Sequence, residues 1–171
     1  MTVAESIAEW LHEKEINHIF GIVGAGNLPL WEAISRKAAT QIVCCHHEQA
    51  AAMAASFYQR TSGRIAVCLV TTGAGSTNAI TGVMAAYMDS TPLLVLSGNE
   101  TAESLWGGTR VLGVQGYDSS GLATRFTKRS RMLARPSCLP AILDDALEYS
   151  TNGRPGPVWI DIPRDVQNEA I

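Results

Sequence analysis

The sequence predicts an α/β protein in which a mainly parallel sheet of about six strands lies between two layers of helices, a three-layer α/β/α arrangement. Short, continuously apolar segments, typical of strands buried on both faces, alternate with helical segments at intervals of about thirty residues or less. Right-handed crossovers between such strands produce a parallel sheet with helices on both faces. Because 46% of the 171 residues are hydrophobic, the chain can build a substantial core, and we expect one domain over residues 1–171.

The first half of the chain is expected to contain three strands separated by helices. Thr2 and Glu5 form a Thr-x-x-Glu capping box, which marks the start of a helix. Apolar residues at helical spacing follow it: Ala4, Ile7, Ala8 and Leu11. Strands are expected at residues 18–23, 41–45 and 65–70, and helices at residues 28–37 and 48–60. The third strand reads Ile-Ala-Val-Cys-Leu-Val, a run without alternation that indicates burial on both faces.

The second half is expected to continue the same alternation. A helix should follow the loop at residues 71–76, with one face formed by Ile80, Val83, Met84 and Tyr87. We expect strands at residues 92–97, 123–128 and 158–162, the second of them polar. The last long helix is marked by Leu139, Ile142, Leu143, Ala146 and Tyr149. Residues 99–121 are glycine-rich and irregular, and long ordered loops are often functional.

Composition and charge exclude several classes of protein. The net charge is −3, from 13 Lys and Arg against 16 Asp and Glu, so no basic field is available to hold nucleic acid. Apolar runs are too short to span a membrane. Residues 1–10 carry two Glu and no basic cluster, which is unlike a signal peptide. Four cysteines without a CxxC pair then predict reduced, buried thiols in a cytoplasmic protein.

Two glycine loops follow predicted strands, at residues 24–26 and 73–75, and both read Gly-Ala-Gly. A dinucleotide-binding fingerprint would need a third glycine where this chain has Pro29 and Asn78. Neither loop continues into Gly-Lys-Ser/Thr, so there is no phosphate-binding P-loop. The loops are therefore either tight strand-to-helix turns or the lining of a ligand crevice at the strand carboxyl ends.

The segment Cys44-Cys45-His46-His47-Glu48 contains several potential metal ligands. Along a strand, side chains alternate between the two faces, so at most residues 44, 46 and 48 share a side. His12 and His18 are isolated, and no second cluster supplies further ligands. We therefore expect no metal site in this chain, and His46 is interpreted as a packed or hydrogen-bonded residue.

Glu48 stands where the second strand gives way to an alanine-rich helix. One interpretation is a first-turn carboxylate that stabilises the helix dipole, an effect below about 1 kcal/mol. The other is a desolvated carboxyl group that shares a proton with a ligand nitrogen, because its neighbours are small and apolar. The five alanines between residues 50 and 55 also permit very close packing, which suits an interface as well as a core.

Four motifs together resemble the N-terminal pyrimidine-binding domain of thiamin diphosphate enzymes, in the acetolactate synthase-like branch. They are His47-Glu48-Gln49-Ala50-Ala51, Leu69 through Asn78 (Leu-Val-Thr-Thr-Gly-Ala-Gly-Ser-Thr-Asn), Ala86 through Pro92 (Ala-Tyr-Met-Asp-Ser-Thr-Pro) and Gly153 through Val158 (Gly-Arg-Pro-Gly-Pro-Val). The resemblance extends from about residue 5 to residue 166. It implies the thiamin diphosphate-binding fold of the pyrimidine type.

The resemblance also implies an activity and a set of site residues. Enzymes of this family are lyases and transferases that decarboxylate or ligate 2-oxo acids. The glutamate matching Glu48 hydrogen-bonds N1′ of the cofactor aminopyrimidine and favours the imino tautomer that removes the C2 proton. Cofactor-binding residues are matched by Gly73, Ala74 and Asn78. The loop facing the substrate is matched by Val23, Gly24, Ala25, Gly26, Asn27 and Gln115.

The chain departs from acetolactate synthases at residues 22–25, 72–75, 99 and 114–116, which leaves the donor and acceptor substrates open. It also contains no Gly-Asp-Gly motif, the element with which the family holds the diphosphate and Mg²⁺. The expected partner is therefore a diphosphate-binding chain or domain that carries this motif and the metal, in a hetero-oligomer such as a heterotetramer. The alternatives are a non-catalytic assembly or regulatory module that retains the fold, and a nucleotide-binding oxidoreductase domain.

Overall fold

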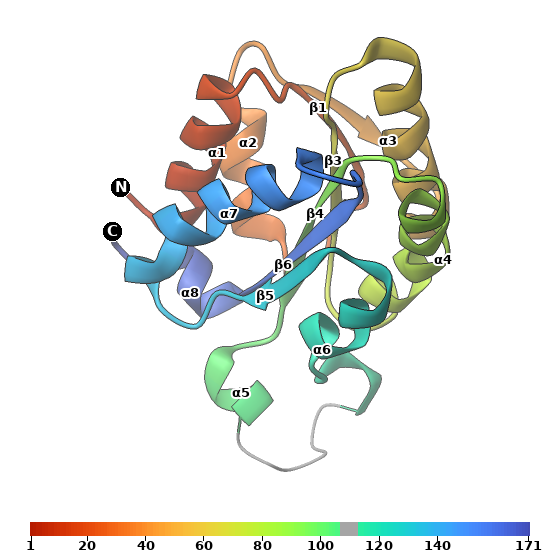
Figure 1. The fold of residues 1–171 in the computed structure, drawn as a ribbon. Coiled ribbons are helices and arrows are strands. Elements are labelled where there is room, and N and C mark those ends of the chain that lie inside the picture. The colour runs from red at the N-terminus through yellow and green to blue at the C-terminus, as the bar shows by residue number, and fades with distance from the viewer. Residues whose placement is uncertain (107–112) are drawn as a thin grey trace.

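The computed structural model describes residues 1–106 and 113–171 and contains a six-stranded sheet between two helical layers (Figure 1). The strand order is β2-β1-β3-β4-β6-β5, and all pairs are parallel. The strands are β1 (His18–Gly21), β2 (Gln41–Cys44), β3 (Val67–Val70), β4 (Leu93–Asn99), β5 (Arg129–Met132) and β6 (Pro157–Pro163). The predicted three-layer α/β/α class is confirmed.

Two hydrophobic clusters hold the helices against opposite faces of the sheet. One face is covered by α1 (Val3–Glu13), α2 (Leu28–Ser35), α7 (Leu139–Thr151) and α8 (Arg164–Asn168). The other is covered by α3 (Glu48–Ser62), α4 (Ala74–Met88) and the short α6 (Ser119–Ala123). The remaining helix is α5 (Ala102–Trp106), and single 3₁₀ turns lie at Gly113–Gln115, Thr124–Phe126 and Pro136–Cys138.

The central strands are buried on both sides because every second residue enters a different cluster. In β3, Val67 and Leu69 pack toward α1 and α2, while Cys68 and Val70 pack toward α3 and α4. The strand β4 alternates in the same way. The continuous apolar runs in the sequence are therefore explained by central strands that have no solvent-facing side.

The predicted elements are largely present, with shifts of a few residues at their ends. At the N-terminus, the Thr2 hydroxyl accepts from the Glu5 amide, and the Glu5 carboxylate accepts from the Thr2 amide, as a capping box requires. The polar strand predicted at residues 123–128 is wrong. Asp118 caps α6 there by accepting from the Gly121 amide, a 3₁₀ turn follows, and the strand β5 begins only at Arg129.

The buried face of α4 differs from the predicted one. Val83 is buried, but Met84 and Tyr87 are more than one-third exposed. The helix instead packs on α3 through small residues: a Cβ built on Gly82 would lie 2.6 Å from the Cβ of Ala52. Because α3 and α4 approach so closely, the large apolar side chains of this pair are displaced outward, and Met88 is 62% exposed.

The cysteines also depart in part from expectation. All four are free thiols, but Cys44 and Cys138 are exposed and Cys45 is half-buried. Only Cys68 is fully buried, and burial raises the pKa of its thiol. Cys44 is accessible because β2 lies at the edge of the sheet. Among the residues with assigned structure, no helix is both long and apolar enough to cross a membrane.

The two ends of the chain meet beside α1 and α8 (Figure 1). Thr2 and Ala170 form an antiparallel bridge. The amide of Ile171 donates to the carbonyl oxygen of Met1 at 3.0 Å. The first and last residues are thus joined by backbone hydrogen bonds.

Candidate functional site at the carboxyl ends of β1 and β3

The strand order creates a topological switch point between β1 and β3. The chain leaves β1 into α2 on one face of the sheet, and it leaves β3 into α4 on the other. The loops after β1 and β3 therefore leave the sheet in different directions. In open α/β sheets, ligands bind outside the strand carboxyl ends at such a topological switch point.

Glu48 begins α3 and is 8% exposed. Its Oε2 accepts a hydrogen bond from Nδ2 of Asn78, on α4, at 3.0 Å. No hydrogen bond to Oε1 is found within the residues that the structure describes. The two helices thus orient a nearly buried carboxyl group and leave one oxygen available.

Gly75 lets the start of α4 lie close to Thr71 and to the Glu48 carboxyl group. A Cβ at this position would lie 3.4 Å from Glu48 Oε1 and 2.8 Å from Cγ2 of Thr71. The first of these is an ordinary contact, but the second requires the Thr71 side chain to move. A glycine here keeps the start of α4 close to both residues.

The turn before α4 is covered by the segment around Gln115. Gly73 has a φ of +60°, and a Cβ there would lie 2.6 Å from Oε1 of Gln115 and 2.8 Å from the carbonyl oxygen of Val114. The Thr72 hydroxyl donates to Gln115 Oε1 at 2.8 Å. Both the positive φ and the close approach of Gln115 require glycine at position 73.

Tyr117 continues this cover. Its hydroxyl hydrogen-bonds Oγ of Ser76 and donates to the carbonyl oxygen of Gly73 at 3.2 Å. Burial raises the pKa of the phenol, and the Ser76 hydroxyl partly opposes this effect. The Gln115–Tyr117 segment is therefore attached to the turn at Gly73 through three hydrogen bonds.

The loop after β1 lies against the loop after β3. The Gly26 amide donates to Oγ1 of Thr71 at 3.1 Å, and a Cβ on Gly24 would lie 2.5 Å from the same oxygen. Asn27 is fully buried, and its Oδ1 accepts from the Gly24 amide at 2.8 Å. Of the predicted loop residues, Val23 and Ala25 are exposed.

The structure brings the predicted residues to one edge of the sheet in two groups. Glu48, Asn78 and the turn at Gly73-Ala74 form one group with Gln115, and residues 23–27 form the other. Thr71 connects them, because it contacts both Gly26 and Gly75. Sequence reasoning did not single out Thr71, although its position at the end of a buried strand could have indicated it.

A buried polar network lies beneath this edge and was also not anticipated. Asp161, on β6, is fully buried, and its Oδ2 accepts from Nδ2 of Asn99 at 2.7 Å. The same amide donates to the Tyr117 carbonyl oxygen at 3.2 Å. Burial raises the pKa of Asp161 to about 6, against the opposing effects of Asn99 and of the Ser97 and Ser119 hydroxyls. The only sequence signal was a lone acid inside the apolar run Val-Trp-Ile-Asp-Ile.

The histidine and cysteine cluster before α3 has a local role. His47 caps the helix, since its Nδ1 accepts from the Gln49 amide at 3.2 Å. His46 is exposed, so its interpretation as a packed residue is wrong. Over residues 1–106 and 113–171, no group of three or more His, Cys, Asp or Glu is arranged to hold a metal ion.

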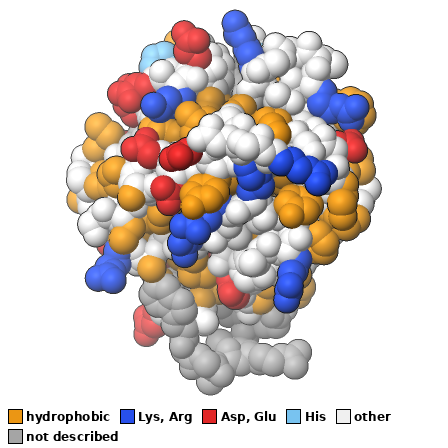
Figure 2. Space-filling view, viewed as in Figure 1, with side chains coloured by type: hydrophobic (Ala, Val, Ile, Leu, Met, Phe, Trp, Pro, Cys, Tyr) orange, Lys and Arg blue, Asp and Glu red, His pale blue; other side chains and the backbone are white. Residues whose placement is uncertain are grey.

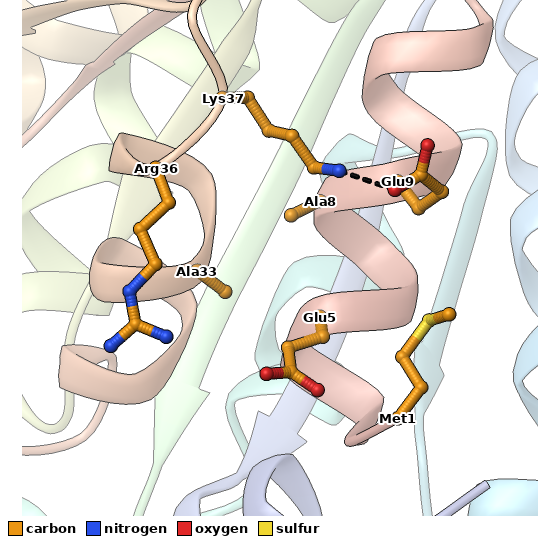
Figure 3. Close-up of a pocket in the computed structure, with 7 residues that line it drawn as sticks. All are labelled: Met1, Glu5, Ala8, Glu9, Ala33, Arg36 and Lys37. Atoms are coloured by element: carbon orange, nitrogen blue, oxygen red, sulfur yellow. Dashed lines mark hydrogen bonds and ion pairs between the residues drawn. The ribbon is translucent and has the colours of Figure 1, made fainter.

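A separate groove of about 430 Å³ lies between α1 and α2, on the face of the sheet opposite α3 and α4 (Figure 3). Its charged side chains already have partners: Lys37 pairs with Glu9, and Glu5 belongs to the capping box of α1. Acidic, basic and hydrophobic side chains are interspersed on the face that carries α1 and α7 (Figure 2). Neither feature has the convergent polar groups found at the carboxyl ends of β1 and β3.

The fold and the site define an α/β domain with polar side chains gathered at the topological switch point of a parallel sheet, the place where such domains commonly bind ligands. Residues 1–132 match the family described as thiamine pyrophosphate enzyme, N-terminal TPP binding domain. The chain belongs to this family.

Its relatives include acetolactate synthases. One from Arthrospira platensis is 40% identical over 174 residues, which cover 100% of this chain and 29% of the relative. The isozyme 1 large subunit of Escherichia coli (strain K12) is 37% identical over 166 residues, or 97% of this chain and 29% of the relative. A probable large subunit from Methanocaldococcus jannaschii is 38% identical over 174 residues, or 100% and 28%. The chain thus spans less than one-third of the length of these relatives.

Proposed function

We propose that this chain is the pyrimidine-binding domain or subunit of a thiamin diphosphate-dependent enzyme that decarboxylates a 2-oxo acid or uses it to form a carbon–carbon bond. The observation that carries the proposal is the Glu48 carboxyl group. It is nearly buried, fixed through Oε2 by Asn78, and faces the start of α4 through Oε1. Membership of the thiamine pyrophosphate enzyme family supports the choice of cofactor.

The residues at this edge fit an aminopyrimidine ring. A ring nitrogen needs a single carboxyl oxygen that can share a proton with it, in a setting that excludes water. Glu48 Oε1 meets this requirement, because the Asn78 amide engages the other oxygen and keeps the carboxyl group from rotating. Because position 75 is glycine, no side chain there crowds Oε1 of Glu48.

Each group of residues has a distinct task in the proposed reaction. When bound, thiamin diphosphate supplies a thiazolium ring that serves as an electron sink next to the substrate carbonyl. Glu48 holds a proton at Oε1, and Asn78 orients its carboxyl group. The turn at Gly73-Ala74, covered by Gln115, bounds the ring from the α4 side. The loop at residues 23–27 faces the substrate.

We assign the diphosphate group and Mg²⁺ to a second domain or chain with a Gly-Asp-Gly motif. The length of the relatives, more than three times that of this chain, supports the need for such a part. We expect a hetero-oligomer if this part is a separate chain. We also expect the chain alone to bind thiamin diphosphate weakly or not at all, because it holds only the pyrimidine end. Calorimetry that shows micromolar binding without a partner would contradict this expectation.

The experiment that tests the proposal compares two carboxyl-to-amide substitutions in the complete assembly. Glu48→Gln removes the proton-sharing oxygen, and we expect turnover of a 2-oxo acid to fall by about 100-fold or more, the range typical of general acid–base groups. Glu13→Gln, on the exposed side of α1, is the matched control and should leave turnover unchanged. Glu48→Gln turnover within a few-fold of wild type would refute the assigned role. An assembly in which the wild-type chain also supports no turnover would favour the non-catalytic module.

A further inference from the structure

The loop after β1 is held by a residue 141 positions further along the chain. Gln167, on α8, donates from Nε2 to the carbonyl oxygens of Gly26 and Ile162, each at 2.7 Å. The side chain is fully buried. Because both partners are backbone carbonyls, which only accept, the amide nitrogen must face them. Both of its protons are therefore used.

The oxygen of the Gln167 side-chain amide shows which interactions make glutamine useful at this position. Gln167 Oε1 is buried and has no hydrogen-bond partner in the described part of the chain. A buried amide oxygen without a partner is unfavourable, and an apolar side chain such as Met would fill the same space without that penalty. The contribution of Gln167 is therefore the pair of hydrogen bonds that it donates, rather than its volume.

Gly26 is enclosed from two further directions. Its amide donates to Thr71 Oγ1 at 3.1 Å, and a Cβ on Gly98 of β4 would lie 2.1 Å from its carbonyl oxygen. Gly26 thus contacts Thr71 through its N–H, and it contacts Gly98 and Gln167 through its carbonyl group. Of the three, only Gln167 lies beyond the 132 residues that match the family.

We propose that Gln167 is a positioning residue that sets the place of the loop at residues 23–27 relative to Thr71 and β3. The catalytic consequence rests on the proposed function, in which this loop faces the substrate. Gln167 touches neither Glu48 nor Asn78 through a hydrogen bond. Loss of its donors should therefore disturb binding of the 2-oxo acid more than activation of the cofactor.

Nuclear magnetic resonance on the wild-type chain provides a test that needs no variant and no turnover. Both Nε2 protons of Gln167 should be protected from exchange, and Nε2 should show scalar coupling through its hydrogen bonds to the carbonyl carbons of Gly26 and Ile162. Exchange of both protons at the rate of a free glutamine side chain would overturn the proposal.

A pair of variants tests the effect on the loop. Gln167→Met keeps the length of the side chain and removes its donors, and amide exchange at Gly26 and Asn27 should accelerate by about 10-fold or more. Exchange in β4 should stay unchanged. Asn168→Ala is the control, because its exposed side chain bonds only the Arg164 carbonyl oxygen of its own helix. Equal loop exchange in Gln167→Met and in the control would refute the positioning role.

Kinetics of the complete assembly separate positioning from simple destabilisation. In Gln167→Met, KM for the 2-oxo acid should rise by about 5-fold or more, while kcat and the dependence on thiamin diphosphate change less. A uniform loss of active enzyme would lower kcat alone and would overturn the proposed link to the substrate. A wild-type assembly without turnover would refute the proposed function, and the exchange experiments would still decide the role of Gln167.

Discussion

The buried acid on β6 makes folding stability depend on pH in a defined direction. Burial raises the pKa of Asp161 from the usual 3.8 to about 6 in the folded chain. The folded state therefore retains the proton after the unfolded chain has released it. Stability from this group is fully present below pH 3.8 and is lost as the pH rises through 6.

The magnitude follows from the two pKa values. A difference of about two units corresponds to about 3 kcal/mol of unfolding free energy, and about 2.4 kcal/mol of this change falls between pH 4 and 7.5. Asp161→Asn removes the titration and keeps an oxygen that can accept from Asn99. The stability of Asp161→Asn relative to wild type should therefore increase by about that amount across this interval.

Urea unfolding of both proteins at a series of pH values measures this difference directly, because the other titrating groups cancel in the comparison. Asp144→Asn is the control, since Asp144 is exposed on α7 and should show no such trend. A difference that stays constant within about 0.5 kcal/mol, or that changes in the opposite direction, would refute the assignment. Tyr117 and Asp118 are the neighbouring titratable groups, and Tyr117 stays neutral over this interval because the pKa of its phenol is raised.

Three further predictions concern backbone geometry and helix capping. Gly98→Ala would place a Cβ 2.1 Å from the Gly26 carbonyl oxygen, so we expect a loss of several kcal/mol, about 3 or more, in urea unfolding. Gly63→Ala, at a φ of +73° with nothing within 4 Å, should cost only about 1 kcal/mol, and an equal cost at both sites would contradict the steric argument. Thr2→Ala removes the capping box of α1 and should lower stability by about 1 kcal/mol, and an unchanged melting temperature would show that the cap is dispensable.

The sequence predicted well those elements whose local pattern of apolar residues matches their burial in the folded chain. The central strands β3 and β4 are apolar throughout because both of their faces are covered, and their positions could be read directly. The strand β5 reads Arg-Ser-Arg-Met and lies at a sheet edge, so it has no such pattern. It forms because its backbone pairs with β6, a long-range contact that leaves no local signal.

The sequence likewise predicted some residues of the candidate site and missed others. Glu48 stood out because a lone carboxylate preceded a run of alanines, and the glycine loops stood at strand ends. The buried face of α4 could not be read, since only the close approach to α3 explains why small residues face inward. The contact between Gln167 and Gly26 joins opposite ends of the chain, so no spacing rule could reveal it.

The hydrogen-bonded ends have a consequence for how the domain can be rearranged. With Thr2 paired to Ala170, a short peptide could join the last residue to the first and make the backbone a closed ring. New ends could then be opened at the exposed turn after α3, at Gly63. Such a circular permutant would present its elements in a different order yet retain the sheet and the edge that carries Glu48. The fold thus depends on which elements contact one another and not on the point at which the polypeptide starts.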